Sequence, residues 1–453
     1  MRDNSDTIFA QATPPGRSAI AVIRISGERA FDAPPLFGCE VPPPGTFRVT
    51  RLADSDGGMI DEAMMLAMKG PRSSTGEDVI EIHAHGSVAV TSAILRRLGE
   101  VDGFRPAGPG EFTHRMFANG KIDLLGAEAL ADLIDAETDR QRLQAWRQKD
   151  GALHQPVDSW RGALVRLAAQ LEAVIDFADE ELPADIEAQI RVDTLSLADA
   201  IESVLDDGGL AERVRDGVTV GLVGPVNAGK STLLNRLAGR DAAIVSSQAG
   251  TTRDIVTVRI DLDGVPVTLL DTAGLRETED AIEAEGVRRA EAVARDADAV
   301  LFVVDASDVG WRHDLARLQG ISQAPRGVLM TKRDRLGGDR DIGMDVPSDA
   351  RLVSLKNDPH GTDLGQVLDL LRDLVIPANR PDVQSIITRA RHRHALTRAS
   401  EALRMASGID LALAPEIAAE EYRRAADNLG RLTGQVDVEE LLDSIFSSFC
   451  IGK

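Results

Sequence analysis

The pattern of apolar and polar positions divides the 453-residue chain into four stretches. Residues 1–121 mix alternating apolar runs with Gly and Pro, which predicts a domain of strands and helices. Residues 122–214 carry apolar side chains at three- and four-residue spacing, which predicts long amphipathic helices. In residues 215–378 short apolar runs alternate with helical segments, as in a parallel sheet covered by helices, and the helical pattern returns in residues 379–453.

The order of these stretches predicts a multidomain α/β protein. The simplest arrangement is an N-terminal α+β domain (1–121) and an α-helical domain (122–214 and 379–453) into which an α/β domain (215–378) is inserted. The helices before and after the insert then pack together. Two independent helical domains on either side of the α/β domain are the alternative.

Composition and charge narrow the class of protein. The chain is 43% hydrophobic and has a net charge of −22, so it repels phosphates on average, and contact with RNA requires a local basic patch or a partner protein. Its two cysteines, Cys39 and Cys450, cannot form a disulfide framework and fit a reducing compartment. Because no signal-peptide pattern and no apolar run of about 20 residues is present, we expect a cytoplasmic protein.

Lysine is rare in this chain, which is otherwise rich in arginine. A lysine that persists in such a background indicates a need for its compact ammonium group, because lysine and arginine are not interchangeable. Two of the seven lysines, Lys69 and Lys149, fit ordinary surface positions. The other five fall in the motifs described below: Lys121, Lys230, Lys332, Lys356 and Lys453.

The strongest motif is a phosphate-binding loop, Gly224-x-x-x-x-Gly229-Lys230-Ser231, placed between an apolar strand (218–223) and a helical segment. Backbone N–H groups of such a loop surround phosphates at a helix N-terminus. Lys230 reaches the β- and γ-phosphates, and the Ser231 hydroxyl binds Mg²⁺. The nucleotide contacts expected here are Asn227, Ala228, Gly229, Lys230, Ser231 and Thr232.

Two further segments resemble the base-recognition elements of GTPases. Thr331-Lys332-Arg333-Asp334 resembles N/T-K-x-D, in which the carboxylate accepts hydrogen bonds from guanine N1–H and the 2-amino group. Asp334 would therefore select GTP, and Thr331 stands where Asn is usual. Ser354-Leu355-Lys356 is similar to the S-A-K element that backs the base.

The segments expected to sense the γ-phosphate lie between these motifs. Asp271-Thr272-Ala273-Gly274 fits D-x-x-G, with Asp271 holding Mg²⁺ through water and the Gly274 amide contacting the γ-phosphate. Gly250-Thr251-Thr252-Arg253 resembles part of the switch I segment, which would begin at Ser246, and Thr252 would complete the Mg²⁺ coordination begun by Ser231. The expected GTP contacts in that segment are Ser246, Ser247, Gln248, Ala249, Gly250, Thr251 and Thr252.

The usual water-orienting Gln is missing after D-x-x-G, because Leu275 stands there. Another group must orient the attacking water, and an acidic run follows directly. Its acids are otherwise typical of a solvated helix start, where the helix dipole favours them. The candidates are Glu277, Glu279, Asp280, Glu283 and Glu285.

The whole chain resembles the MnmE (TrmE) family of tRNA uridine-modification GTPases. The resemblance is carried by DTIFAQATPPGRSAIAVIRISG near the start, by TGEDVIEIHAHG and PGEFTHRMFANGKIDLLGAEALADLIDA, by the GTPase motifs, and by LTGQVDVEELLDSIFSSFCIGK. It implies a tetrahydrofolate-binding, dimerising N-terminal domain and a helical domain carrying an inserted Ras-like P-loop GTPase domain. It also implies a homodimer that forms a heterotetramer with the FAD protein MnmG.

The resemblance further implies a reaction. The two proteins would install (carboxymethyl)aminomethyl groups at C5 of the tRNA wobble uridine, with a one-carbon unit from a 5-formyl- or methylene-tetrahydrofolate. The partner would carry much of the tRNA binding, which suits the acidic chain.

The resemblance also implies roles for particular residues. Asn227 is typical of potassium-activated GTPases, in which K⁺ supplies the positive charge that an arginine finger gives elsewhere. The implied K⁺ ligands are Asn227, Ser246, Gln248 and Thr251, the implied catalytic acid is Glu283, and the implied folate site is Arg24, Glu81, Lys121 and Lys453. Cys450 lies beside that site in the family pattern, and a chemical role and a buried structural one both stay open for it.

Two other functions remain as alternatives. A ribosome-assembly GTPase with extra domains would share the nucleotide motifs, but such factors lack this N-terminal domain and the tail CIGK. A metal-dependent enzyme is the other, because Glu81, His83 and His85 alternate and would project from one face of a strand. The resemblance to the MnmE family also predicts that Phe446 and Phe449 dock the closing segment against the N-terminal domain.

Overall fold

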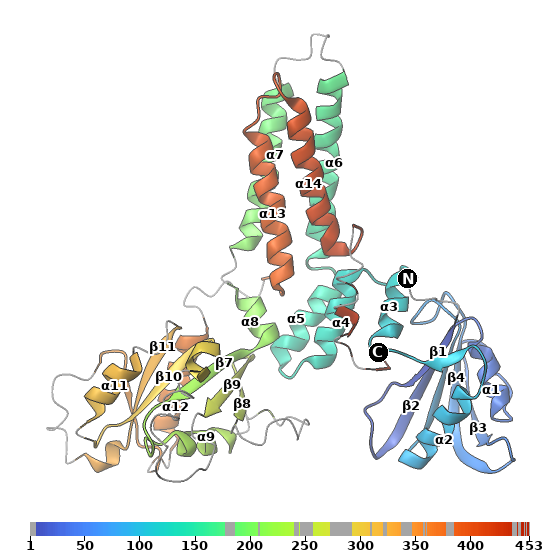
Figure 1. The fold of residues 1–453 in the computed structure, drawn as a ribbon, viewed down its shortest axis with the longest axis horizontal. Helices are drawn as coiled ribbons and strands as arrows, with labels where there is room; N and C mark the ends of the chain where they lie inside the picture. The colour runs from blue at the N-terminus through green and yellow to red at the C-terminus, as the bar shows by residue number, and fades with distance from the viewer. Residues whose placement is uncertain are drawn as a thin grey trace. The chain divides into compact units, whose positions relative to one another are not determined.

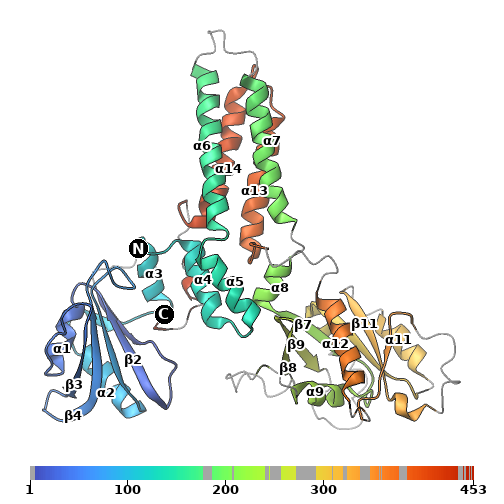
Figure 2. The same ribbon diagram turned by 180° about the vertical axis from the view of Figure 1, so that it is seen from behind.

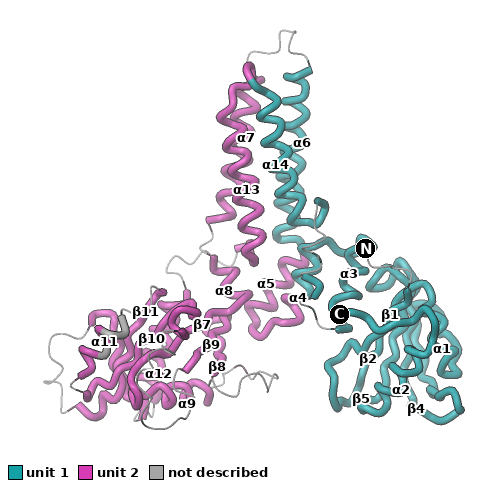
Figure 3. Tube along the Cα trace, viewed as in Figure 1, with its two compact units in different colours: residues 1–131, 151–176, 414–453 teal, residues 132–150, 177–413 magenta. Residues whose placement is uncertain are grey.

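The computed structural model describes most of the chain, in two compact units. The described residues are 6–176, 186–206, 209–239, 244, 257–271, 292–308, 310–319, 324–336, 347–356, 358, 360–376, 385–436, 442, 445–447, 449 and 451–452. Contacts between residues define unit 1 as 1–131, 151–176 and 414–453, and unit 2 as 132–150 and 177–413 (Figure 3). The domain boundaries deduced from the sequence stay a prediction.

Unit 1 contains a six-stranded sheet of order β3-β4-β5-β2-β1-β6, antiparallel except for the β1–β6 pair. Helix α2 lies against one face of this sheet (Figure 1). It buries Thr91, Ile94 and Leu98, and this face carries the core. The elements are β1 (Thr7–Gln11), β2 (Ser18–Ser26), η1 (Ala30–Asp32), α1 (Ala33–Leu36), β3 (Phe47–Ala53), β4 (Met59–Met68), β5 (Val79–Gly86), α2 (Val88–Gly99) and β6 (Phe104–Pro106).

The other face of this sheet is covered by Phe112 over β1 and is partly exposed over the strands from β2 to β3. Alternation along β2 buries Ala21, Ile23 and Ile25, whereas Arg24 lies on the opposite face, in register with Glu81 of β5. Large apolar side chains remain exposed on this face: Ile20 (58%), Phe47 (66%) and Val49 (61%).

The helices of unit 1 are α3 (Glu111–Ala118), the start of α4 (Leu124–Asp135), α6 (His154–Asp176) and α14 (Pro415–Thr433). Helices α6 and α14 pack side by side (Figure 2). The buried positions of α6 recur every three or four residues, which confirms the amphipathic pattern in the sequence. They are Val157, Trp160, Leu164, Leu167, Leu171 and Val174.

Unit 2 contains the predicted parallel sheet, of order β12-β11-β10-β7-β9-β8, with β8 antiparallel to β9. Helices cover both faces, so β10 is buried from Ala299 to Val304, as expected for a strand covered on both sides. The strands are β7 (Val218–Val223), β8 (Thr257–Leu262), β9 (Val265–Asp271), β10 (Ala299–Asp305), β11 (Arg326–Thr331) and β12 (Arg351–Leu352).

The helices of unit 2 complete the multidomain α/β fold. Those around the sheet are α8 (Leu210–Asp216), α9 (Lys230–Ala238), α11 (Trp311–Gln319), η2 (Arg333–Arg335) and α12 (Thr362–Val375). The others are α5 (Asp139–Lys149), α7 (Ile186–Leu205) and α13 (Ala390–Ser407), and α7 packs against α13. Over the described part of the chain, none of the helices combines the length and apolarity that a bilayer span needs.

Candidate functional site

The phosphate-binding loop joins β7 to α9 in the order that the motif predicts. β7 ends at Val223 and α9 begins at Lys230. A side chain at Gly224 would place its Cβ 2.0 Å from the Val303 carbonyl oxygen, and Gly229 has a φ of 103°. Both positions therefore require glycine.

Lys230 is buried and spans its own loop. Its Nζ donates hydrogen bonds to the carbonyl oxygens of Gly224 (2.7 Å) and Pro225 (2.8 Å). Burial lowers the pKa of Lys230, and the negative charge of Asp271 opposes that shift. A phosphate at this loop would give the ammonium a full anionic partner in place of two carbonyl dipoles.

Ser231 and Asp271 form an oxygen-rich pair at the adjoining strand end. The Ser231 Oγ donates to Asp271 Oδ2 at 3.3 Å, so helix α9 and strand β9 present a hydroxyl and a carboxylate to the same point. Hydroxyl and carboxylate oxygens are the ligands that Mg²⁺ takes in nucleotide sites. The two residues therefore fit the metal that the motif implies.

Thr331, which stands where Asn is usual, connects β11 to the phosphate-binding loop. Its hydroxyl lies 2.5 Å from the carbonyl oxygen of Ala228 and 3.2 Å from that of Val304, and the residue is 2% exposed. The hydroxyl thereby ties the base-recognition strand β11 to the phosphate-binding loop.

The base-recognition residues meet at the ends of β11 and β12. The Ser354 hydroxyl donates to Asp334 Oδ1 at 2.7 Å, and this bond is the main cause that lowers the pKa of Asp334. Lys332 adopts a left-handed conformation (φ 61°) and donates to Asp305 Oδ2 at 2.6 Å. Leu355 is buried and Lys356 is exposed. Asp334 is thus an ionised acceptor with a defined orientation, as guanine recognition requires.

The structure brings Arg24 and Glu81 together on the sheet face opposite the core. Arg24 Nε donates to Glu81 Oε1 at 2.9 Å, and the guanidinium lies 5.7 Å from the centre of the Phe112 ring. Lys121 follows α3 and donates to the Pro71 carbonyl oxygen at 2.8 Å. These three expected folate residues thus lie on β2, β5 and the segment after α3.

The two histidines of β5 contact different carboxylates. His83 Nε2 is 3.2 Å from Glu81 Oε2, whereas His85 Nδ1 is 2.8 Å from Asp61 Oδ1. In the residues that the structure describes, no three His, Cys, Asp or Glu side chains gather to hold a metal ion. The alternative of a metal-dependent enzyme finds no support among them.

The remaining predicted site residues lie outside the described part of the chain. They are Ser246, Ser247, Gln248, Ala249, Gly250, Thr251, Thr252, Thr272, Ala273, Gly274, Glu283, Cys450 and Lys453.

The closing segment docks on unit 1 as predicted. Phe446 packs edge-on against His114 of α3 with the ring centres 5.1 Å apart, and it also contacts Phe449. Ile451 forms a β-bridge with Pro109, just before α3. The described residues on either side of Cys450 therefore lie against the N-terminal part of the chain.

Sequence reasoning missed a network of buried charged side chains around Arg115 of α3. Arg115 is fully buried, and its Nη1 donates to both carboxylate oxygens of Glu77 at 3.1 Å. Glu111 lies 3.4 Å from Arg115 Nη2 and accepts two hydrogen bonds from Arg105 (2.6 and 2.9 Å). Their only signal in the sequence was the presence of charges inside the blocks TGED and PGEFTHR.

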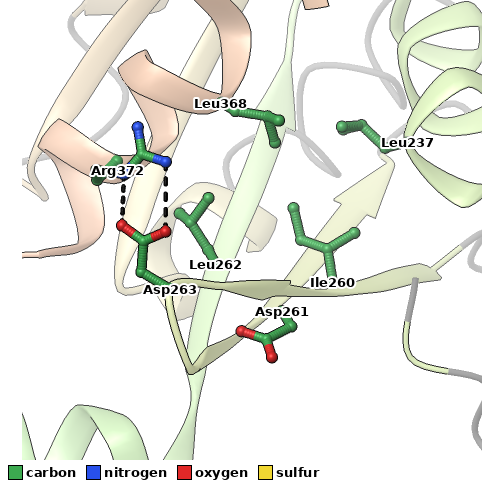
Figure 4. Close-up of a pocket in the computed structure, with 7 residues that line it drawn as sticks. All are labelled: Leu237, Ile260, Asp261, Leu262, Asp263, Leu368 and Arg372. Atoms are coloured by element: carbon green, nitrogen blue, oxygen red, sulfur yellow. Dashed lines mark hydrogen bonds and ion pairs between the residues drawn. The ribbon is translucent and has the colours of Figure 1, made fainter. Parts of the chain in front are cut away.

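A pocket also lies on unit 2, away from the predicted residues. It is lined by Leu237, Ile260, Asp261, Leu262, Asp263, Leu368 and Arg372 (Figure 4). Arg372 Nε donates to Asp263 Oδ2 at 2.7 Å at its rim. The pocket includes the C-terminal end of β8. Because β8 runs antiparallel to β9, and β9 runs parallel to β7, this end of β8 lies beside the N-terminal ends of those strands, whereas the phosphate-binding loop follows the C-terminal end of β7.

The parallel sheet, the loop closed by Lys230 and the ionised Asp334 define a P-loop protein of the guanine-nucleotide-binding class. Comparisons with known proteins specify the family. The family model described as the GTP-binding protein TrmE N-terminus matches residues 7–121, and that of the MnmE helical domain matches residues 124–450.

Full-length relatives agree with these matches. A protein named tRNA modification GTPase MnmE from Paramagnetospirillum magneticum is 47% identical over 99% of this chain and 100% of its own length. One of the same name from Parvibaculum lavamentivorans is 46% identical over 99% of this chain and 100% of its own. The chain belongs to the MnmE family of tRNA modification GTPases.

A solved structure, an Aquifex aeolicus Era variant bound to GDP and AlF₄⁻, is 25% identical over 41% of this chain and 66% of its own. Its TM-score of 0.28 is too low to add to the assignment.

Proposed function

We propose that this protein is a potassium-activated GTP hydrolase that acts in tRNA modification. With the FAD protein MnmG it would install (carboxymethyl)aminomethyl groups at C5 of the wobble uridine, using a tetrahydrofolate one-carbon donor. The observation that carries the proposal is the ionised Asp334, held by Ser354 beside the phosphate-binding loop, in a chain whose full-length relatives are named tRNA modification GTPases.

The described residues supply the binding half of the hydrolysis reaction. Lys230 exchanges its two carbonyl partners for the β- and γ-phosphates, which removes the cost of a buried ammonium without an anion. Ser231 and Asp271 would hold the Mg²⁺ ion, which neutralises charge on the phosphates, together with Thr252 from outside the described residues. Asp334 accepts the two hydrogen bonds that distinguish guanine from adenine.

K⁺ and Glu283 would supply the catalytic half. Asn227 would be one of the K⁺ ligands, a role that rests on the family resemblance. Its φ of 64°, which few residues other than Gly, Asn and Asp adopt, explains the residue type by backbone conformation. The other ligands would be Ser246, Gln248 and Thr251. Because Leu275 has no polar atom to orient water, Glu283 would take that task.

Two experiments test the proposed roles of K⁺ and Glu283 in hydrolysis: an exchange of the cation and a substitution of Glu283. GTP hydrolysis should be much faster in K⁺ than in Na⁺, and Glu283→Ala should slow it about 10²-fold with little change in nucleotide affinity. Glu279→Ala, in the same acidic run, is the matched control and should hydrolyse normally. Equal rates in the two salts would refute the potassium requirement, and normal hydrolysis by Glu283→Ala would refute its role.

The N-terminal part of the chain would bind the folate. Arg24, Glu81 and Lys121 combine positive groups for an anionic tail with a carboxylate for a pterin donor edge, and Lys453 would join them from the docked closing segment. Deletion of residues 450–453 should abolish tetrahydrofolate binding and leave GTP binding unchanged. Retention of tetrahydrofolate at full affinity would exclude the segment from the site.

The exposed apolar side chains of the same sheet face support a homodimer formed through this part of the chain. Phe47 and Val49 lie two residues apart on β3 and are each more than half exposed, as is Ile20 on β2, and exposed apolar surface is typical of protein–protein contacts.

The experiment that tests the whole proposal is mass spectrometry of tRNA wobble uridines. Cells that lack this protein should lose the C5 modification, and the wild-type chain should restore it. Lys230→Ala should fail to restore it, because the phosphate-binding ammonium is gone. A wobble-uridine pattern that does not change when the protein is absent would refute the proposal.

A further inference from the structure

Two carboxylates stand at the start of α12, and they serve different partners. Asp358 accepts a hydrogen bond from the Leu364 backbone N–H at 2.9 Å, and so satisfies a free donor of the helix start. Asp363 is 2% exposed and accepts hydrogen bonds from two other segments. It accepts from Arg333 Nη2 at 2.9 Å and from the Ser354 backbone N–H at 2.7 Å.

These contacts join the two segments that recognise the base. Arg333 directly precedes Asp334 in the segment after β11, and Ser354 follows β12. The Ser354 hydroxyl in turn donates to Asp334 Oδ1 at 2.7 Å. One buried carboxylate thus holds the residue before Asp334 and the residue whose hydroxyl orients Asp334.

We propose that Asp363 is a positioning residue that sets the specificity of the site for guanine over bases that lack a 2-amino group. Asp363 acts through Asp334 and Ser354 and does not contact the base. The proposal rests on the proposed GTP binding and deepens it.

The physical reason is the geometry of a paired hydrogen bond. Guanine offers N1–H and the 2-amino group side by side, and one carboxylate accepts both only when its plane is aligned with the base. Ser354 occupies one oxygen of Asp334 and fixes that plane. Without Asp363, the buried Ser354 N–H loses its acceptor and Arg333 loses its ionic partner, so both supports of Asp334 loosen together.

Hypoxanthine is the natural probe, because it keeps N1–H and lacks the 2-amino group. We would measure the dissociation constants of GDP, IDP and ADP for the full-length wild-type protein, Asp363→Ala and Asp363→Asn. The wild type should prefer GDP to IDP by about 10- to 100-fold, the range for one hydrogen bond to a charged group. Asp363→Ala should reduce that preference to a few-fold, mainly through weaker GDP binding.

Asp363→Asn keeps an acceptor for the Ser354 N–H and loses the charge that holds Arg333. It should show an intermediate preference, and it decides the question if the alanine variant does not fold. Asp358→Ala is the matched control, since it weakens the same helix start without touching the base segments. It should keep the wild-type preference even if its thermal unfolding temperature falls.

The outcomes distinguish a failure of the positioning role of Asp363 from a failure of the proposed GTP binding. An unchanged GDP/IDP ratio in both Asp363 variants would overturn the positioning role, and so would an equal loss of GDP and IDP affinity, which would mark a purely structural residue. A wild-type protein with no preference for GDP over ADP would refute the proposed GTP binding itself.

Discussion

Replacement of Thr331 by valine isolates the bond between the base-recognition strand and the phosphate-binding loop. Valine keeps the branched shape and removes only the hydroxyl, which lies 2.5 Å from the Ala228 carbonyl oxygen and 3.2 Å from that of Val304. A hydroxyl has one proton, so it donates to one carbonyl at a time, and the shorter distance favours Ala228. Both Thr331 and Ala228 are buried, so water does not replace the lost bond.

The size of the effect follows from this burial. A hydrogen bond contributes about 0.5–1.5 kcal/mol net, and a buried acceptor left without its donor costs about 1–3 kcal/mol. We therefore expect Thr331→Val to cost about 1–2 kcal/mol. Because the bond to Ala228 holds the phosphate-binding loop in place, its loss should weaken nucleotide binding about 5- to 30-fold.

Titration with fluorescent GDP and with IDP measures the loss. The two affinities should fall by the same factor, since the broken contact lies at the phosphate loop and not at the base. Thr194→Val in α7 is the matched control, because its hydroxyl is also buried and donates to the Ile190 carbonyl oxygen at 2.7 Å. A Thr331→Val affinity within twofold of wild type, or no weaker than that of Thr194→Val, would refute this reasoning.

Three further predictions concern contacts outside the nucleotide site. Gly264→Ala should destabilise the protein by about 1–3 kcal/mol more than the control Gly57→Ala. Both glycines have a positive φ (86° and 82°), but only at Gly264 would the new Cβ clash, at 2.4 Å from Arg140 Cβ. Equal thermal unfolding temperatures of the two variants would contradict this. Glu202 has a pKa of about 2, lowered from 4.5 by hydrogen bonds from the facing α13, so its stabilisation is full above pH 4.5 and is lost as the pH falls through 2. Glu202→Gln should therefore lower the unfolding temperature at pH 7 and progressively less on acidification, and a pH-independent difference would exclude the carboxylate as the cause. Arg115→Met should cost about 3–5 kcal/mol, because two carboxylates lose a fully buried partner, and should leave GDP affinity unchanged; unaltered thermal unfolding would show that the network is dispensable.

The parts of the fold that the sequence revealed are those whose signal is local. The phosphate-binding loop needs a strand, glycines and a helix start within about 20 residues, and all of them are adjacent in the chain. The alternation in β2 and the three- to four-residue spacing in α6 likewise report which face of one element is buried. Each of these patterns can be interpreted without knowing what the element packs against.

The contacts that organise the site have no such local signal. Asp363 lies 30 residues from Arg333, and Arg115 lies 38 residues from Glu77. Nothing in their neighbourhoods separates them from the many acids and arginines of a charged surface. Their roles depend on which loops the folded sheet brings together, and a periodic pattern does not encode that.

The start of α5 explains why residues 132–150, which belong to the helical stretch of the sequence, form one compact unit with the parallel sheet. Thr138 caps α5 by accepting from the Gln141 N–H at 3.2 Å, and its hydroxyl proton goes to the Gly264 carbonyl oxygen at 2.8 Å, in the turn between β8 and β9. Gln141 completes the capping box with its Oε1 and donates its Nε2 hydrogen to the Arg215 carbonyl oxygen at 3.0 Å, just before β7. In the sequence, Thr138 and Gln141 predict only a helix start. Because each cap residue has a second hydrogen-bonding group, the same two side chains also fix the helix to the turn between β8 and β9 and to the end of α8.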